Sequence, residues 1–258
     1  MGVGRRFIRS QQVLSLAFDS LLPSSYRVDG NRDFREDFAP RYLRPGTVVL
    51  DVGGGKHPFV DPETKRFLDL QVIGVDIDAE ELRLAPSGAY DSVICCDVEQ
   101  LDLPDSVDIA VCQAVLEHVR DTRGAIASIA RALRPGGRFI LFAPSRNAIF
   151  ARLNLVFPER FKRWVLFWMF PQTRQGQGFA AFYDRCTPRD VVSAARSQGL
   201  VLLEKRTYYL SRYFAFLFPL YVLWRAWTVV FRALVGDQAA ESFSLAFEKP
   251  KLHATATG

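Results

Sequence analysis

The sequence predicts an α/β fold built on a parallel sheet, and three observations support this prediction. Short apolar runs rich in β-branched residues recur through the middle of the chain. Most of these runs end in an acidic residue, and a helix-like spacing of apolar residues separates the last two. Continuous apolar runs are typical of strands buried on both faces, and their alternation with helices is typical of parallel sheets. The 258 residues are ample for a full core.

Five strands are expected in the middle of the chain. They are predicted at 47–52, 71–78, 91–99, 107–115 and 137–145. Before the fifth strand, Ile126, Ile129 and Leu133 fall on one helical face, and Gly136 and Gly137 are expected to end that helix. Because ligands bind such sheets at the carboxyl ends of the strands, the glycines and acids found there predict a binding site.

The stretch "VVLDVGGGKHPF" (48–59) follows the first strand and does not have the spacing of the common phosphate-binding loops. A P-loop would need glycine in place of Leu50 and serine or threonine in place of His57. A dinucleotide fingerprint fits at Gly53 and Gly55, but Pro58 stands where its third glycine is required. Neither a nucleotide triphosphate nor NAD(P) is therefore favoured.

The same stretch resembles the first motif of class I S-adenosylmethionine-dependent methyltransferases, of the small-molecule or lipid type ("methyltransferase type 11"-like). The resemblance continues in order over about 46–145 through "VIGVDID", "CCDVEQLDLP", "VDIAVCQAVLEHV" and "ALRPGGRFILFAPS". It implies an α/β, seven-stranded, doubly wound Rossmann-like sheet with a helical lid and insertions. It also implies S-adenosyl-L-methionine as the methyl donor, and an acidic segment suits that cationic, phosphate-free molecule.

The resemblance carries over to a set of cofactor-binding residues. Asp76 is expected on the ribose hydroxyls, Asp97 on the adenine amino group, and Asp51 on the methionyl amino group through water. The Gln113 carbonyl is a second expected partner of that amino group. The alternative for Asp76 and Asp97 is a solvated loop or a helix cap, and Asp78 is expected to be such a cap. The complete expected set is Asp51, Gly53, Gly54, Gly55, Asp76, Ile77, Asp97, Val98 and Gln113.

His118 is the candidate catalytic residue, as a general base near the acceptor, with a structural histidine as the alternative. Some quinol and small-RNA methyltransferases resemble this region with E-x-x-E-H, a metal-ligand cluster. Here Ala114 takes the place of the first acid, and the chain has three histidines, so no metal site is expected. His57 replaces a family glycine; Lys56 and His57 are interpreted either as lining the mouth of the site or as solvated loop residues.

Charge divides the chain into three expected segments. Residues 1–45, a helical flank, carry +3; residues 46–145, the cofactor-binding core, carry −7; residues 146–258 carry +9 and all four tryptophans. The last segment is expected to supply strands at 201–210 and 241–250, a helix capped by Thr187 with Pro188 at its first position, and a basic aromatic lid. The four cysteines have no C-x-x-C spacing, which favours a reduced compartment, with Cys95, Cys96 and Cys112 as core residues.

The apolar helix expected at 211–235 bears on the substrate class. Its uncharged run at 213–224 is too short to span a bilayer, and tryptophan and tyrosine beside arginine suit a helix in the headgroup layer. A lid or dimer contact and a spanning helix are the alternatives. The +9 charge favours anionic lipid, whereas blocks of apolar aromatics disfavour nucleic acid.

These patterns predict a methyltransferase acting on oxygen in a hydrophobic, lipid-linked or glycan acceptor. We expect a cytoplasmic enzyme, peripheral at the inner face of the membrane, because no convincing targeting segment is present. A soluble aromatic acceptor is the first alternative. A non-catalytic subunit of the same fold that recruits a partner to membrane, and an RNA methyltransferase, remain the others.

Overall fold

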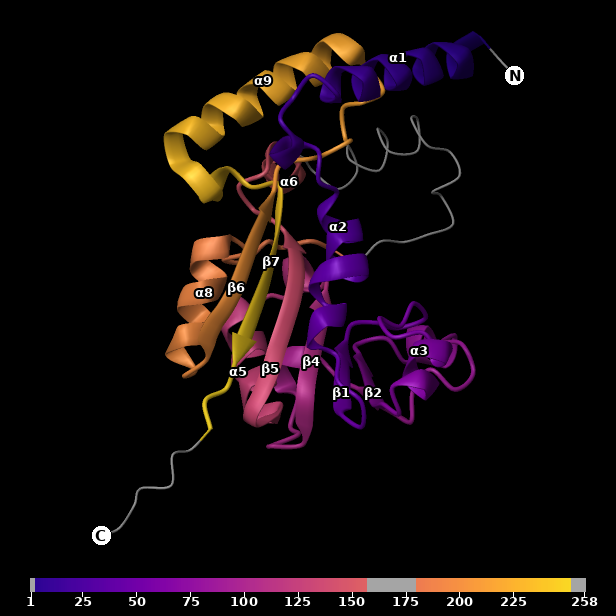
Figure 1. Cartoon of the computed structure of the whole chain (residues 1–258), viewed down its shortest axis with the longest axis vertical. Coiled ribbons are helices and arrows are strands. Elements are labelled where there is room, and N and C mark those ends of the chain that lie inside the picture. The colour runs from indigo at the N-terminus through magenta and orange to yellow at the C-terminus, as the bar shows by residue number, and fades with distance from the viewer. Residues whose placement is uncertain (1–2, 157–179, 252–258) are drawn as a thin grey trace.

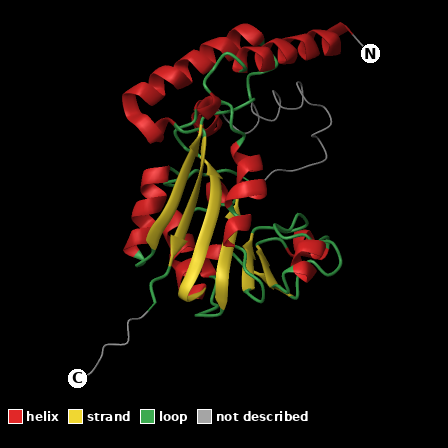
Figure 2. Ribbon diagram, viewed as in Figure 1, coloured by secondary structure: helices red, strands yellow, loops and turns green. Residues whose placement is uncertain are grey.

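The chain folds around one seven-stranded sheet with helices on both faces (Figures 1 and 2). The computed structural model describes residues 3–156 and 180–251. The strands are β1 (Val48–Val52), β2 (Gln71–Asp76), β3 (Ser92–Cys95), β4 (Val107–Gln113), β5 (Leu133–Pro144), β6 (Val201–Tyr208) and β7 (Ser242–Glu248). Their order across the sheet is β3-β2-β1-β4-β5-β7-β6, which confirms the predicted fold class.

The helices and helical turns are α1 (Val3–Asp19), η1 (Ser24–Tyr26), α2 (Gly30–Asp33), η2 (Phe34–Phe38), η3 (Pro40–Tyr42), α3 (Pro62–Phe67), α4 (Ala79–Arg83), η4 (Val98–Gln100), η5 (Leu116–His118), α5 (Thr122–Ala132), α6 (Ile149–Val156), α8 (Pro188–Ser197), α9 (Phe218–Val235) and η7 (Gly236–Ala239). Most of the predicted basic aromatic lid, from 157 to 171, lies outside the described residues.

The sheet is parallel through the middle of the chain, as predicted, and becomes mixed where β7 enters it. Strands β1 to β5 pair in parallel, whereas β7 lies between β5 and β6 and runs antiparallel to both. Helix α9 crosses the end of the sheet where β6 finishes (Figure 1). After α9, the chain returns to the sheet at the same end at which β6 finished. Strand β7 therefore runs in the direction opposite to β6.

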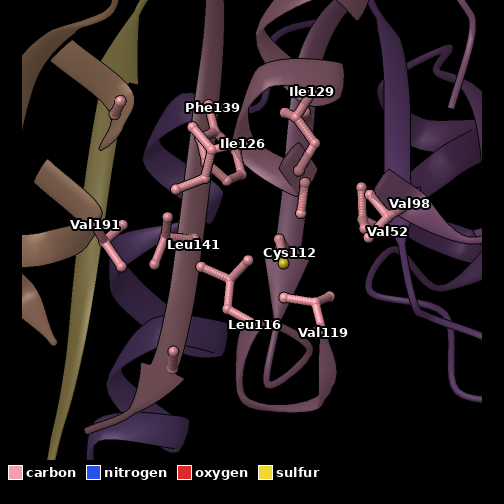
Figure 3. Close-up of a cluster of buried hydrophobic side chains, with 14 of the residues drawn as sticks. Val52, Val98, Cys112, Leu116, Val119, Ile126, Ile129, Phe139, Leu141 and Val191 are labelled. Carbon is pink, nitrogen blue, oxygen red and sulfur yellow. The ribbon is translucent and has the colours of Figure 1, made fainter. Parts of the chain in front are cut away.

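Each face of the sheet has its own buried core. On one face, side chains of β1, β4 and β5 pack with those of α5 and α8, and Figure 3 shows Cys112, Leu116, Leu141 and Ile126 meeting there. On the other face, Phe34 and Phe38 of η2 pack in one cluster with apolar side chains of β1, β2, β4 and β5, among them Val49 and Val72. Both faces of β1 and β4 are thus covered, which explains their continuous apolar sequences.

The boundary between α5 and β5 differs from the prediction. Helix α5 ends at Ala132, and Leu133 already begins β5, where it pairs with Val107. The backbone carbonyls of Arg131 and Ala132 accept hydrogen bonds from Asp105 and Ser106. These contacts draw the chain into the sheet, while the buried Leu133 continues the apolar spacing past the end of the helix.

Strand β3 also differs from its prediction, since it covers only 92–95 of the expected 91–99. It lies at the edge of the sheet, and Val93 and Cys95 are exposed there. Cys95 is therefore not a core residue, whereas Cys112 is fully buried as predicted. The helix caps at Asp78 and Thr187 are confirmed, since their side chains accept hydrogen bonds from Glu80 and Asp190 backbone N–H groups.

Candidate functional site

A cavity of about 350 Å³ opens at the carboxyl ends of β1, β2 and β4. This is the position at which parallel α/β sheets bind ligands. Its lining combines backbone of the glycine loop, two carboxylates, an imidazole and apolar side chains. The lining residues include Gly53, Asp76, Ile77, Asp97, Val98, Val115, His118, Val119 and Phe182. Six of them belong to the expected site, five as cofactor contacts and His118 as the base.

Gly53 shapes the floor of this cavity. Its φ is +70°, its N–H donates to the Val75 carbonyl over 2.6 Å, and a Cβ added to it would lie 2.3 Å from Cγ2 of Val115. Gly55 has φ +48°, and a Cβ there would lie 3.0 Å from a carboxylate oxygen of Asp76. Both positions therefore require glycine, and of the two only Gly53 lines the cavity.

Asp76 ends β2 beside this loop and lines the cavity. One of its oxygens accepts from the Asp78 N–H over 2.9 Å, and only 8% of the residue is exposed. Burial raises the pKa of Asp76, and the nearby Asp78 and Glu81 carboxylates raise it further. A buried carboxylate of this kind gains from ligand hydroxyl donors, because they satisfy its remaining lone pairs.

Asp97 combines the two roles considered from the sequence. Its side chain accepts from the Glu99 N–H over 3.0 Å and so caps η4, while the residue also lines the cavity. Val98 and Val119 form an apolar wall next to it, with Phe182 also on the lining. A carboxylate beside an apolar wall suits a flat heterocycle with an exocyclic amino group.

Asp51 is buried and is absent from the lining, so its expected contact with the ligand through water stays a prediction. Its carboxylate accepts from the Phe59 N–H over 2.7 Å and from the Tyr90 hydroxyl over 3.3 Å. Burial raises the pKa of Asp51 to about 6. A Cβ on Gly54 would lie 2.4 Å from this carboxylate, so Gly54 makes room for Asp51. Both residues hold the loop in shape instead of touching the cavity.

Gln113 ends β4 and its side chain turns toward the N-terminal flank. It accepts from Arg35 over 2.9 Å and donates to Asn31 over 2.6 Å. Arg35 also donates to the Phe59 carbonyl and lies over the Phe59 ring. Arg35 could not be singled out from the sequence, because nothing distinguishes it from the other arginines of the flank. The next residue, Ala114, lines the cavity with a φ of +56°.

His118 lies at the edge of the cavity, with 32% of its side chain exposed. Its Nδ1 lies 3.0 Å from the Ala180 carbonyl oxygen, which can only accept, so Nδ1 donates. In the neutral ring Nε2 is then the basic nitrogen, and it lies 3.8 Å from a carboxyl oxygen of Glu117. Burial raises the pKa of Glu117 to about 8. The burial of Glu117 could not be predicted from the sequence, because acidic side chains are rarely buried.

The remaining loop candidates lie on the surface. Lys56 forms an ion pair with Glu81 over 2.9 Å, and His57 is exposed. Neither lines the cavity, which agrees with their interpretation as solvated residues. Within residues 3–156 and 180–251, no group of three or more His, Cys, Asp or Glu side chains is arranged to hold a metal ion.

Comparison with known proteins identifies the domain in which this site lies. Residues 50–141, which run from β1 into β5, match the family model described as a methyltransferase domain. The chain carries a class I S-adenosylmethionine-dependent methyltransferase domain. The predicted resemblance is thereby confirmed, and S-adenosylmethionine is the cofactor of this domain family.

The methyltransferase domain has relatives at moderate identity. A ubiquinone biosynthesis O-methyltransferase of Idiomarina loihiensis is 33% identical over 141 residues, which cover 52% of this chain and 56% of that protein. The chain thus matches little more than half the length of this curated relative.

Solved structures share the fold at low identity. A putative sarcosine dimethylglycine methyltransferase of Galdieria sulphuraria has a TM-score of 0.55 at 15% identity, with 85% of each chain covered. Phosphoethanolamine N-methyltransferase 2 of Haemonchus contortus, solved with S-adenosyl-L-methionine, has a TM-score of 0.54 at 18% identity, covering 97% of this chain and 61% of that one. The methyltransferase domain therefore keeps a common fold while its sequence varies.

Proposed function

We propose that this protein transfers a methyl group from S-adenosylmethionine to a hydroxyl oxygen of a hydrophobic, lipid-linked acceptor at the inner face of the membrane. The observation that carries the proposal is the joint position of His118 and Asp76 on one cavity at the strand ends. One side chain suits a cofactor ribose and the other suits proton transfer. The O-methyltransferase relative supports oxygen as the methylated atom.

The cavity fits the cofactor on its own chemistry. Gly53 lines the cavity with bare backbone, because a Cβ there would collide with Val115, and the Asp76 carboxylate keeps accepting capacity for ligand hydroxyls. Asp97 and Val98 would hold the adenine, with Ile77 beside the ribose. Bound S-adenosylmethionine supplies a methyl group whose bond to the sulfonium sulfur breaks as the acceptor oxygen takes the carbon.

His118 would take the hydroxyl proton of the acceptor. The Ala180 carbonyl fixes the ring with Nδ1 protonated and leaves Nε2 as the basic atom. Burial raises the pKa of the Glu117 carboxyl to about 8, so this group is largely protonated at neutral pH. It therefore adds little negative charge beside the ring. The chain therefore contributes mainly alignment of the acceptor, together with one base.

The test is incubation of the full-length protein with labelled S-adenosylmethionine and separated lipid, glycan and RNA fractions of the source cell. Label in a methyl ether of the lipid fraction is the expected result, and His118→Gln should lower kcat about 100-fold or more without weakening cofactor binding. Label only in RNA, or in a soluble aromatic compound, would replace the acceptor. A chain that fails to bind the cofactor in calorimetry would be a non-catalytic subunit.

A further inference from the structure

Helix α9 presents an unusually apolar surface. Its outward side carries Leu220, Leu223, Trp227, Val230 and Leu234, spaced alternately by three and four residues and all more than a third exposed. Both arginines of α9 lie elsewhere: Arg225 is fully buried, and Arg232 stacks on Tyr209, with 4.3 Å from its guanidinium carbon to the ring centre. The exposed stripe is therefore continuous and uncharged, which is rare on a solvent-exposed protein surface.

Helix α1 extends this surface. The two helices lie beside each other across the end of the sheet (Figure 1), and they are joined by Gln11 to Phe218, Ser15 to Ala215 and Asp19 to Tyr221. The outward side of α1 adds exposed apolar side chains at its middle and end. These are Val13, Leu14 and Leu16, with Leu21 just beyond the helix.

The exposed charges on the two helices have one sign, and Asp237, which follows α9, is paired with Lys205 over 2.6 Å. Arg6 and Arg9 of α1 are exposed, and so is Arg212 just before α9. Among the described side chains of α1 and α9 the one carboxylate, Asp19, is buried and paired with Arg225. An apolar surface that offers cations and no exposed carboxylate is complementary to an anionic lipid layer.

We propose that α1 and α9 together form a docking surface for an anionic phospholipid bilayer, which they meet lying flat. The inference rests on the proposed function, for which it names the membrane partner, and it adds α1 to the single helix expected from the sequence. A second copy of the chain fits less well, because a symmetric contact would bring arginines against arginines without a carboxylate to pair with them.

The contacts between α9 and the rest of the protein favour docking with the helix parallel to the membrane surface. Among the described residues one helix, Phe218–Ala239, is long and apolar enough by length and composition to cross a membrane, with a mean hydropathy of 1.3. Its inward side carries Tyr221, Arg225 and Thr228, all buried against the protein. Spanning would expose the Arg225 charge to hydrocarbon and break its pair with Asp19, at a cost that lying flat avoids.

The experiment is flotation of the full-length protein with vesicles of phosphatidylglycerol and phosphatidylcholine, compared with vesicles of phosphatidylcholine alone. We expect wild type to bind the anionic vesicles, and the double substitution Leu223→Glu with Trp227→Glu to weaken binding at least tenfold. The matched control is Phe67→Glu, because Phe67 is even more exposed but lies on α3, and it should bind as wild type does. Arg6→Gln with Arg9→Gln should weaken binding to anionic vesicles roughly tenfold to thirtyfold.

Three results would overturn the proposal. The double glutamate variant could still bind vesicles, or wild type could form a dimer without lipid that the same variant does not form. Vesicle-bound protein could also resist carbonate extraction, which would show that it spans the bilayer. Calorimetry with S-adenosylmethionine separates this failure from that of the proposed function. The surface variants should bind the cofactor as wild type does. A wild-type protein that docks on vesicles but neither binds nor uses the cofactor would overturn the proposed function alone.

Discussion

Arg225, in the middle of α9, places its Nε 2.9 Å from a carboxylate oxygen of Asp19 at the end of α1. The same guanidinium donates to the backbone carbonyls of Tyr26 and Tyr209, and Tyr221 donates to the other oxygen of Asp19. One buried side chain therefore ties together α1, the turn that follows it, the end of β6 and α9.

We expect Arg225→Met to lower the free energy of unfolding by about 3–5 kcal/mol, because it leaves the Asp19 carboxylate buried without its partner. Urea denaturation measures this. The double variant Asp19→Asn with Arg225→Met should recover part of the loss, since no buried charge is left unpaired. Arg212→Met, at an exposed neighbouring arginine, is the control and should change stability by less than about 0.5 kcal/mol. Equal losses in the single and double variants would contradict the coupling.

Gly53→Ala should abolish cofactor binding and lower stability by about 2 kcal/mol or more, because the new Cβ would lie 2.3 Å from Val115 at a φ of +70°. The control is Gly88→Ala, where φ is +78° but nothing lies within 4 Å. That variant should cost only about 1 kcal/mol and keep the cofactor affinity. Adding Val115→Ala should restore part of the stability of Gly53→Ala. Calorimetry and thermal unfolding give both readouts.

Asp76→Asn should weaken S-adenosylmethionine binding about 100-fold, because a neutral amide replaces a charged acceptor for two hydroxyl groups. Stability should hardly fall, since burial already raises the pKa of Asp76 and disfavours its charge. Asp78→Asn is the matched control, because asparagine caps a helix as well as aspartate does. Unchanged affinity in Asp76→Asn, measured by titration calorimetry, would refute the cofactor assignment.

Glu241→Gln should make stability less dependent on pH. Burial raises the pKa of Glu241 from 4.5 to about 8, and one of its oxygens is buried without a hydrogen-bond partner. The folded state therefore binds a proton that the unfolded state releases, so the stability contributed by this group is present below pH 4.5 and is lost as pH rises toward 8. The variant should gain up to a few kcal/mol over wild type at pH 9 relative to pH 5. A constant difference between the two proteins across this range would contradict the assignment.

The strand positions could be predicted from the sequence because each carries its own signal. A buried strand such as β1 is apolar throughout and is followed by glycines, whatever its neighbours are. The direction of β7 could not be predicted, because it depends on where α9 returns the chain to the sheet. The predicted end of α5 was wrong for a related reason. An apolar residue at position 133 fits the buried face of a helix and a strand of the same core equally well.

In the candidate site, too, some residues could be predicted from the sequence and others could not. Gly53, Asp76 and Val98 reach the cavity because the backbone at strand ends places them there. Asp51 and Gln113 lie at strand ends as expected, and the carbonyl role of Gln113 stays a prediction. The hydrogen bonds of their side chains with Tyr90 and Arg35 could not be predicted, because those partners come from distant parts of the chain. Arg225 shows the limit most clearly. Beside tryptophan and tyrosine it suggested a headgroup contact, yet its fully buried guanidinium faces inward to Asp19.

The pairing of α1 with α9 also sets an order of events during synthesis. Helix α1 leaves the ribosome first, and at about 5–20 residues per second its partner follows roughly 10–40 s later. Until then the apolar side of α1 and the carboxylate of Asp19 have no α9 to pack against. A nascent chain thus carries only half of the surface proposed for docking, and that surface would be complete only after α9 has packed against α1.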